Sequence, residues 1–290
     1  TGVLVDSFLV LKENCTDTLF YLFSAISGQE VFRFGDKGRG VCEFYYPFFL
    51  VNSFAYDSLI IYDSPAATLT KIDLAALVES RDIAKCANSE HLYRNLNFMY
   101  NFNKIDSAFI GTFIEKDEGL FSFCNRNNGE IKNTDYVPYY FYEKGRKDAY
   151  CHHVLVSEKD NSIIVPFKYM NLINCYDLDG NLKVTYALDW IKEEINTQIR
   201  VDEHTTVTFY RTYATRNRCY LVWDGHKIEE ELRKYPAKIV VMNWQGELEK
   251  VYQLDNFADF IIPDEKQRMI YVGVYNAGLE FVEIYKYPML

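Results

Sequence analysis

Two aromatic clusters offer the clearest binding chemistry in the sequence. One runs from Tyr136 to Tyr142, and the other holds Tyr210, Arg211 and Tyr213, with Trp223 ten residues further along. Aromatic faces and a guanidinium group can bind a sugar or a peptide, although the cores of repeat domains also consume aromatic residues. We expect Tyr210, Arg211, Tyr213 and Trp223 to form part of a surface binding patch, with packing in the core as the alternative.

The second candidate is a short loop whose structural residues are Gly35, Gly38, Gly40 and Phe44. Three glycines in six residues permit positive φ and a tight path of the chain. A dinucleotide-binding loop would open a helix, and a P-loop would end in Gly-Lys-Ser/Thr; neither context is present. We interpret the loop as a structural connection, in which the charges of Arg39 and Glu43 pair with each other or face a ligand.

Metal-binding patterns are missing from the sequence. The segment Asp177–Asn181 begins like a calcium loop, but Leu182 and Leu188 occupy the positions that need glycine and glutamate. The adjacent His152 and His153 would point to opposite faces of a strand. The seven cysteines include no Cys-x-x-Cys pair. We expect no metal site and no cofactor, and we read Gly180 as part of a tight hairpin turn.

Composition and charge exclude several classes of partner. The net charge is −10 with a pI near 5.1, and no basic stripe is visible, so binding to nucleic acid is not expected. No stretch of about 18 apolar residues suggests a membrane span. Aromatic residues make up 17% of the chain, which favours β structure. No Pro/Gly/Ser-rich linker divides residues 1–290, so one domain and a monomer are expected.

A hairpin pattern recurs along the chain and predicts the architecture. An apolar run, a polar-glycine turn and a second alternating run occur around Gly28, Gly129, Gly180 and Gly246. The same pattern without glycine fits Leu59–Tyr62 followed by Leu69–Ile72, and a sixth unit spans Met269–Tyr285. This spacing is typical of propeller blades of about 40–50 residues. The prediction is an all-β, six-bladed β-propeller of antiparallel four-stranded blades.

Short helical insertions and a ring closure complete the predicted fold. Helices are expected near Leu74–Glu79, at Asp189–Ile195 and at Ile228–Lys234, where apolar residues follow a helical period. The last unit ends after its third strand. We predict that Val3–Val5 forms the outer strand of that blade and so covers an exposed edge.

The glycine loop also carries a family resemblance. Gly35-Asp-Lys-Gly-Arg-Gly-Val-Cys-Glu-Phe44, followed by Pro47, resembles the signature of the TolB-like six-bladed propellers of Bacteroidetes. The resemblance covers most of the chain and extends to Asn243–Gly246 and Ile270–Val272, but Val41-Cys42 replaces the usual Pro-Gly. It implies an exported lipoprotein of the cell envelope, in the periplasm or anchored to the outer membrane.

Two functions follow as hypotheses. The first is a non-enzymatic binding module of the bacterial cell envelope that engages a protein, peptide or glycan. The second is a calcium-dependent lactonase or esterase with its site in the central channel, which rests on analogy with other six-bladed propellers. The missing catalytic signatures and the resemblance favour the first hypothesis.

Overall fold

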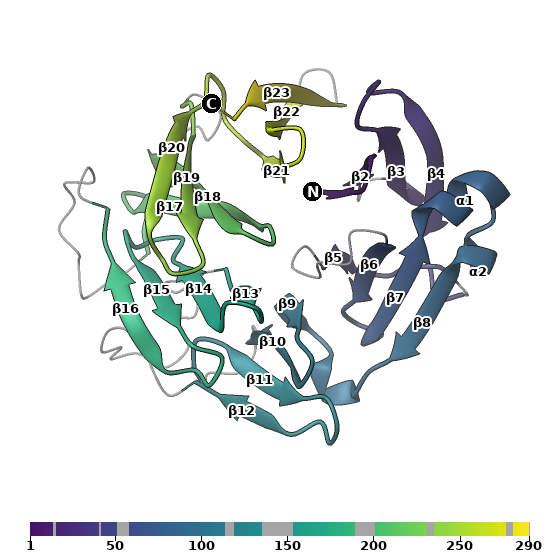
Figure 1. The fold of residues 1–290 in the computed structure, drawn as a ribbon, viewed down its shortest axis with the longest axis horizontal. Helices are drawn as coiled ribbons and strands as arrows, with labels where there is room; N and C mark the ends of the chain where they lie inside the picture. Colours follow the sequence, from purple (N-terminus) through teal and green to yellow (C-terminus); the bar gives the residue numbers. More distant parts are fainter. Residues whose placement is uncertain are drawn as a thin grey trace.

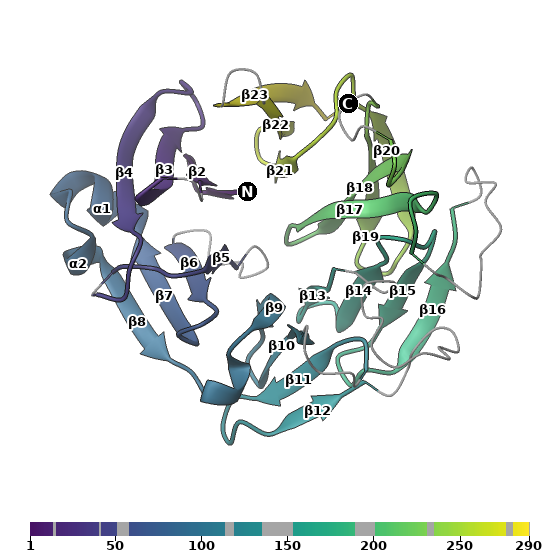
Figure 2. The same ribbon diagram turned by 180° about the vertical axis from the view of Figure 1, so that it is seen from behind.

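The computed structural model describes residues 1–13, 16–40, 42–50, 58–113, 119–134, 153–188, 201–230, 235–276 and 281–289. Within these residues, six antiparallel sheets stand around a ring, five of them with four strands and one with three (Figures 1 and 2). Each blade consists of strands that follow one another in the sequence, and its first strand lies nearest the middle of the ring. The predicted all-β, six-bladed propeller is confirmed.

Among the described residues, helices occur only within blade 2 and in the connection from blade 2 to blade 3. Blade 1 consists of β1 (Gly2–Val5), β2 (Phe8–Lys12), β3 (Thr18–Ser24) and β4 (Glu30–Asp36). Blade 2 consists of β5 (Pro47–Phe49), β6 (Ser58–Asp63), β7 (Thr68–Asp73), the helices α1 (Leu74–Ser80) and α2 (Ile83–Cys86), and β8 (Ala87–His91). After a 3-10 turn at Arg94–Leu96, blade 3 consists of β9 (Met99–Lys104), β10 (Ala108–Phe113), β11 (Ser122–Asn125) and β12 (Ile131–Asn133).

The other three blades follow the same order. Blade 4 consists of β13 (Leu155–Ser157), β14 (Ser162–Pro166), β15 (Ile173–Tyr176) and β16 (Leu182–Tyr186). Blade 5 consists of β17 (Thr206–Ala214), β18 (Arg218–Lys227), β19 (Lys238–Asn243) and β20 (Leu248–Gln253). Blade 6 consists of β21 (Phe260–Asp264), β22 (Met269–Asn276) and β23 (Phe281–Pro288). No helix in the described part of the chain is long and apolar enough to cross a membrane.

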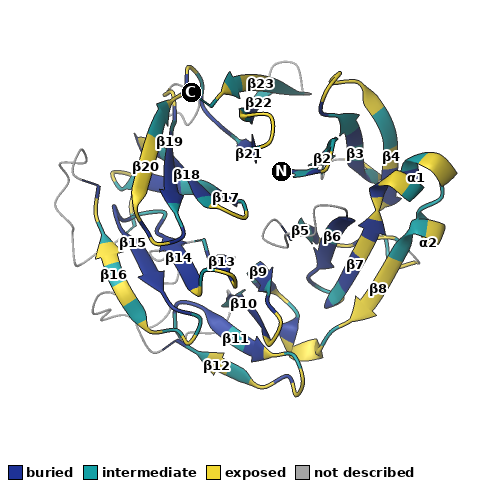
Figure 3. Cartoon of the chain, in the orientation of Figure 1, coloured by how far each residue is buried: buried dark blue, intermediate teal, exposed yellow. Residues whose placement is uncertain are grey.

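The outermost strands of the blades are the least buried. Every residue of β14 and of β21 is buried, whereas no residue of β20 is (Figure 3). A strand covered on both faces reads as a continuous apolar run, and a rim strand alternates with charged residues. The sequences Ser-Ile-Ile-Val-Pro of β14 and Leu-Glu-Lys-Val-Tyr-Gln of β20 follow this rule. The blades therefore pack through their inner strands.

The four glycine turns lie where the sequence places them. Gly28, Gly129, Gly180 and Gly246 each join the third and fourth strands of a blade, with φ between 71° and 85°. At the Gly180 turn, the Asp177 carboxylate accepts a hydrogen bond from the Asn181 N–H at 2.8 Å. This confirms the hairpin interpretation of Asp177–Asn181.

Blade 2 differs from the predicted register. The hairpin of Leu59–Tyr62 and Leu69–Ile72 joins the second and third strands, not the third and fourth. The insertion of α1 and α2 between β7 and β8 causes this shift, and α1 confirms the helix expected near Leu74–Glu79. Asp73 is the N-cap of α1, since its carboxylate accepts a hydrogen bond from the Ala76 N–H at 3.0 Å.

The predicted ring closure is wrong. Val3–Val5 belongs to β1, the innermost strand of blade 1, and pairs with β2. The two-residue connection of Asp6 and Ser7 holds β1 against β2, and Asp6 has φ of 52°. β1 also lies beside β21, so the two ends of the ring meet through inner strands. Val3 and Val5 are buried at this junction.

The remaining predicted helices find no support in the described residues. Ile228–Glu230 forms a turn and a bend after β18, so a helix does not begin at Ile228. Residues 231–234 and the segment Asp189–Ile195 lie outside the described ranges.

Gly180→Val will lower the free energy of unfolding by about 1–3 kcal/mol, because a β-branched residue is strained at positive φ. A Cβ at this position would also lie 3.1 Å from the Phe123 ring of the neighbouring blade. Urea denaturation monitored by circular dichroism measures the change. Asp179→Ala, at the exposed neighbouring position of the same turn, is the control and should alter stability by less than about 0.5 kcal/mol. Equal stability of the two variants would contradict the assigned turn.

Candidate functional site

Tyr210 and Arg211 lie on an irregular stretch of β17. The pairing of β17 with β18 shifts register between Val207 and Phe209, and again between Phe209 and Arg211. Adjacent residues of a regular strand point to opposite faces, but a bulge redirects side chains. The guanidinium carbon of Arg211 consequently lies 3.5 Å from the centroid of the Tyr210 ring.

A lysine from the neighbouring blade completes this arrangement. Lys168 lies between β14 and β15, and its ammonium is 4.7 Å from the centroid of the Tyr210 ring and 4.8 Å from that of Tyr169. We call Lys168, Tyr169, Tyr210 and Arg211 the cation–tyrosine site. All four side chains are half-buried.

Thr208 makes hydrogen bonds to the backbone on both sides of Lys168. Its buried hydroxyl lies 2.7 Å from the carbonyl oxygen of Phe167 and 2.9 Å from that of Met170, and its N–H donates to the Lys168 carbonyl oxygen. Blade 5 is thereby joined directly to the connection between β14 and β15.

Backbone contacts also fix Tyr210 and Arg211. Arg211 Nε donates to the carbonyl oxygen of Asp259, just before β21, at 2.7 Å. His153 Nε2, just before β13, lies 3.0 Å from the Tyr210 carbonyl oxygen. The cation–tyrosine site is therefore connected by hydrogen bonds to residues of blades 4, 5 and 6.

The two cations have no acidic partner in the residues that the structure describes. Lys168 contacts only aromatic rings, and Arg211 contacts only the Tyr210 ring and backbone carbonyl oxygens. A cation–π contact contributes about 0.5–2 kcal/mol, less than charge-assisted hydrogen bonds to a carboxylate in a partly buried site. Both groups thus retain the capacity to bind an anion.

Two buried titratable side chains lie on β18, next to β17. Asp224 and His226 are 4% and 1% exposed, and neither side chain makes a hydrogen bond within the described structure. Burial raises the pKa of Asp224 to about 7, outweighing the opposing attraction of Arg211 and Lys168. Burial likewise lowers the pKa of His226 and so favours the neutral imidazole. The site combines two cations with an acid that is half neutral near pH 7.

The other predicted aromatic residues lie apart from this site. Tyr213 reaches across to blade 1, where its hydroxyl oxygen lies 3.4 Å from the Leu4 backbone nitrogen. The Trp223 ring lies over Gly225, where a Cβ would overlap the ring. The Lys238 ammonium lies 4.9 Å from the centroid of the Trp223 ring. The expected four-residue patch is thus divided, and only Tyr210 and Arg211 are in contact. The cluster at Tyr136–Tyr142 lies outside the described residues.

The glycine loop connects β4 to β5, as its sequence suggested. Gly35 has φ of 72°, and a Cβ there would lie 2.6 Å from the Phe20 ring, against which Phe44 also packs. The Glu43 carboxylate accepts a hydrogen bond from the Gly40 N–H at 2.7 Å and fills the space beside Gly38. Arg39 instead lies over the Tyr45 ring. A ligand-binding role of Arg39 and Glu43 stays a prediction.

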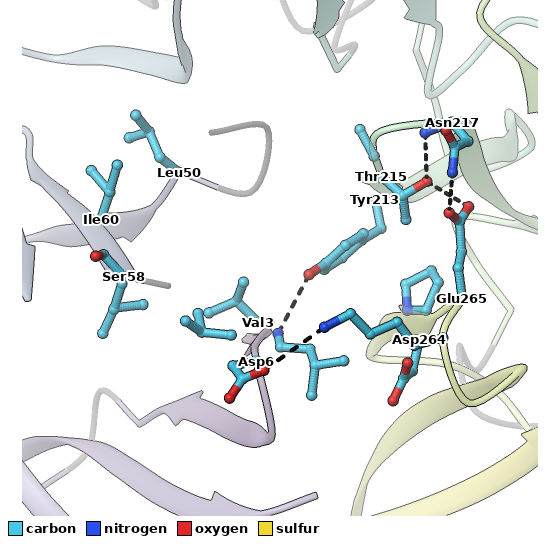
Figure 4. A pocket seen from close by; sticks show the side chains of 16 residues that line it. Val3, Asp6, Leu50, Ser58, Ile60, Tyr213, Thr215, Asn217, Asp264 and Glu265 are labelled. Atoms are coloured by element: carbon cyan, nitrogen blue, oxygen red, sulfur yellow. Dashed lines mark hydrogen bonds and ion pairs between the residues drawn. The ribbon is translucent and has the colours of Figure 1, made fainter. Parts of the chain in front are cut away.

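A cavity of about 350 Å³ lies between blades 1, 2, 5 and 6. Figure 4 shows Leu50, Ser58 and Ile60 on one side of it, opposite Tyr213 and Thr215. The charged groups around it are already paired. Lys266 lies 3.8 Å from Asp6, and the Glu265 carboxylate accepts hydrogen bonds from Thr215 and Asn217. Asp264, a further acidic residue of the lining, accepts a hydrogen bond from the Gln267 N–H at 3.0 Å. Each charged residue of the lining therefore has a partner within the described structure.

Within the described ranges, no three His, Cys, Asp or Glu side chains are grouped so that they could hold a metal ion. At the calcium-like segment, Asp177 pairs with Lys183 at 2.7 Å and accepts from Asn181, so its carboxylate serves the turn. His152 and two of the seven cysteines lie outside the described residues.

Sequence reasoning missed Lys168, Asp224, His226 and Asp259. Lys168 and Asp259 belong to other blades, and no local pattern connects them to Tyr210. Asp224 and His226 did carry a signal, because they continue the apolar strand Cys219–Val222 with two polar residues at alternate positions. Such a pair on one face of an inner strand marks a buried polar group.

Two solved structures share this fold over nearly the whole chain. A member of the DUF4221 family from Bacteroides vulgatus has a TM-score of 0.61 at 11% identity, covering 97% of this chain and 90% of its own. A Bacteroides fragilis protein, whose name marks it as a candidate for export, has a TM-score of 0.53 at 10% identity, covering 93% and 77%. At these identities the likeness shows the fold alone. No protein-family model and no curated protein matches the chain.

Asp224→Asn will remove a pH dependence of stability. Because folding raises the pKa of Asp224 to about 7, the folded wild-type protein holds a proton that the unfolded chain loses above about pH 4. Wild-type stability should therefore fall, relative to Asp224→Asn, by up to about 4 kcal/mol as the pH rises from 4 to 7. Urea denaturation at pH 5, 6, 7 and 8 measures the difference, with exposed Asp179→Asn as control. A constant difference across this range would contradict the assignment.

Proposed function

We propose that this chain is a binding module that catalyses no reaction, and that its ligand binds at the cation–tyrosine site. The observation that carries the proposal is the pair of half-buried cations, Lys168 and Arg211, which no acidic group of the described chain neutralises. Folded proteins seldom hold charged groups away from water without a partner. A ligand that supplies the partner explains the arrangement.

The rigidity of the site supports the same function. Hydrogen bonds from Thr208, His153 and Arg211 join the site to backbone atoms of three blades. A site that is already ordered loses little conformational entropy when it binds a ligand. Binding is therefore favoured without any rearrangement of the ring.

The setting of the module follows the family resemblance. We propose a TolB-like propeller of the Bacteroidetes cell envelope that acts as a monomer and binds a protein, peptide or glycan. The two fold neighbours come from Bacteroides, and one of them is named as a candidate for export, which supports this setting. The calcium-dependent hydrolase is less well supported, because Lys168 and Arg211 would repel a calcium ion bound beside them.

Arg211→Ala and Tyr210→Ala will weaken ligand binding by at least about tenfold, which corresponds to about 1.4 kcal/mol. Arrays of bacterial and plant glycans and of peptides identify ligands of the wild-type protein, and titration of the best of them gives the affinities. Arg126→Ala is the matched control, since Arg126 also lies over an aromatic ring, Phe109, and donates to backbone carbonyl oxygens. Array ligands whose affinity is unchanged by both Tyr210→Ala and Arg211→Ala would contradict the proposed site.

A further inference from the structure

The positive charges of the cation–tyrosine site are close together. The Lys168 ammonium lies 4.7 Å and the Arg211 guanidinium carbon 3.5 Å from one ring centroid, that of Tyr210, so the two cations are within about 8 Å of each other. Both side chains are half-buried, which weakens the screening of their repulsion by water. An anion bound beside both cations would relieve that repulsion.

The nearest candidate for that anion within the chain is Asp224. Its charge would attract both Arg211 and Lys168, yet it makes no ion pair with either, and neither of its oxygens has a hydrogen-bond partner in the described structure. Such a carboxylate is costly to ionise where it stands. It is therefore a poor permanent counter-ion for the two cations.

We propose that Lys168 and Arg211 bind a negatively charged group of the ligand, and that the buried Asp224 competes with that group for the same two cations. This inference rests on the proposed function, because it names the chemistry recognised at the cation–tyrosine site. When Asp224 is protonated, the site carries the full charge of both cations. When Asp224 is ionised, its own charge opposes the incoming anion.

The geometry favours a compact oxyanion, a carboxylate or a sulfate or phosphate group, over a stacked neutral ring. The Tyr210 ring already has Arg211 and Lys168 against it, so it offers little free face for stacking. A guanidinium group presents a planar fork that matches a carboxylate or phosphate, and an ammonium adds a point charge. The ligand class is therefore an acidic saccharide or peptide group held by its charge.

Several other charged or titratable groups surround Asp224. His226, on the same strand, is kept neutral above pH 6.5 because burial lowers its pKa. The Asp259 carboxylate, from the segment before β21, accepts a hydrogen bond from the Tyr275 N–H at 2.6 Å. Glu230, which follows β18, and Lys168 both lie near His226. Burial also lowers the pKa of the Thr1 ammonium, which lies near Arg211, to about 6. The comparison of Asp224→Asn with the wild-type protein therefore assigns the pH dependence to Asp224 and not to Thr1.

The test uses the full chain and two probes that do not titrate between pH 6 and 8, D-glucuronate for a carboxylate and sulfate for an inorganic oxyanion. Their dissociation constants are measured by NMR titration at constant ionic strength. The wild-type protein should bind at least one probe about five- to tenfold more tightly at pH 6 than at pH 8. Asp224→Asn should bind that probe at both pH values about as tightly as the wild-type protein does at pH 6. The preferred probe distinguishes a carboxylate ligand from a sulfate- or phosphate-like one.

Lys168→Met should weaken binding of the probe at least tenfold. Lys250→Met is the matched control and should not, since Lys250 also lies over a tyrosine, Tyr252, but on the rim strand β20. Far-ultraviolet circular dichroism and thermal melting establish that each variant is folded.

Three results of the probe titrations would overturn the inference. They are equal binding by Lys168→Met and the wild-type protein, the same pH profile for Asp224→Asn as for the wild-type protein, and no binding of either probe at pH 6. An array ligand that is neutral, independent of pH and sensitive to Arg211→Ala would overturn this inference while the proposed function stands. Failure of the proposed function would give a different result: array ligands would bind the Tyr210→Ala and Arg211→Ala variants as tightly as the wild-type protein.

Discussion

The structure depends on blades that are covered on both faces near the middle of the ring, so that polar side chains there must find partners inside the protein. Most do. Asp63 accepts hydrogen bonds from the backbone of Tyr45 and Tyr46, and Asn103 donates to the carbonyl oxygen of Val154 in the next blade. Both contacts satisfy a buried polar group, and the second also joins neighbouring blades. Among the described residues, Ser64, Asn97 and Trp223 each leave one buried side-chain atom without a partner, whereas Asp224 and His226 each leave two.

The parts of the fold that could be predicted are those with a local stereochemical cause. A glycine at positive φ marks a hairpin whatever surrounds it, and four such turns placed four blades correctly. In blade 2 the turn with a similar sequence pattern contains Ala67, with φ of 46°, but it joins the second and third strands, and two helices precede the fourth strand. Nothing in the local sequence reveals that difference. The position of β1 depends on which strand edge it meets, which only the closed ring decides.

The binding site could be predicted only in part, for a related reason. Tyr210 and Arg211 are adjacent in the sequence, and the bulges of β17 allow both side chains to meet. Tyr213 and Trp223 looked equally suitable, but the pairing of β17 with β18 turns them toward blade 1 and toward Gly225. Lys168 enters from blade 4 through the hydrogen bonds of Thr208, a contact between residues about forty positions apart. Pattern reasoning finds neighbours in sequence, whereas this site depends on neighbours in space.

Blade 5 shows how one irregular hairpin can be both a structural joint and a recognition surface. Its two inner strands are the longest in the described chain, and their register shifts free backbone and side-chain groups to contact blades 4 and 6. The same irregularity brings Asp224 into the protein without a partner, which lowers the stability of the ionised form. Asp177 shows the opposite arrangement, because Lys183 and Asn181 satisfy its carboxylate fully in a turn at the rim. An acid that only stabilised the ring would be expected to resemble Asp177. Asp224 lies instead where its charge acts on Lys168 and Arg211. The stability lost by burying its carboxylate is best explained if Asp224 regulates the binding of an anion by these two cations.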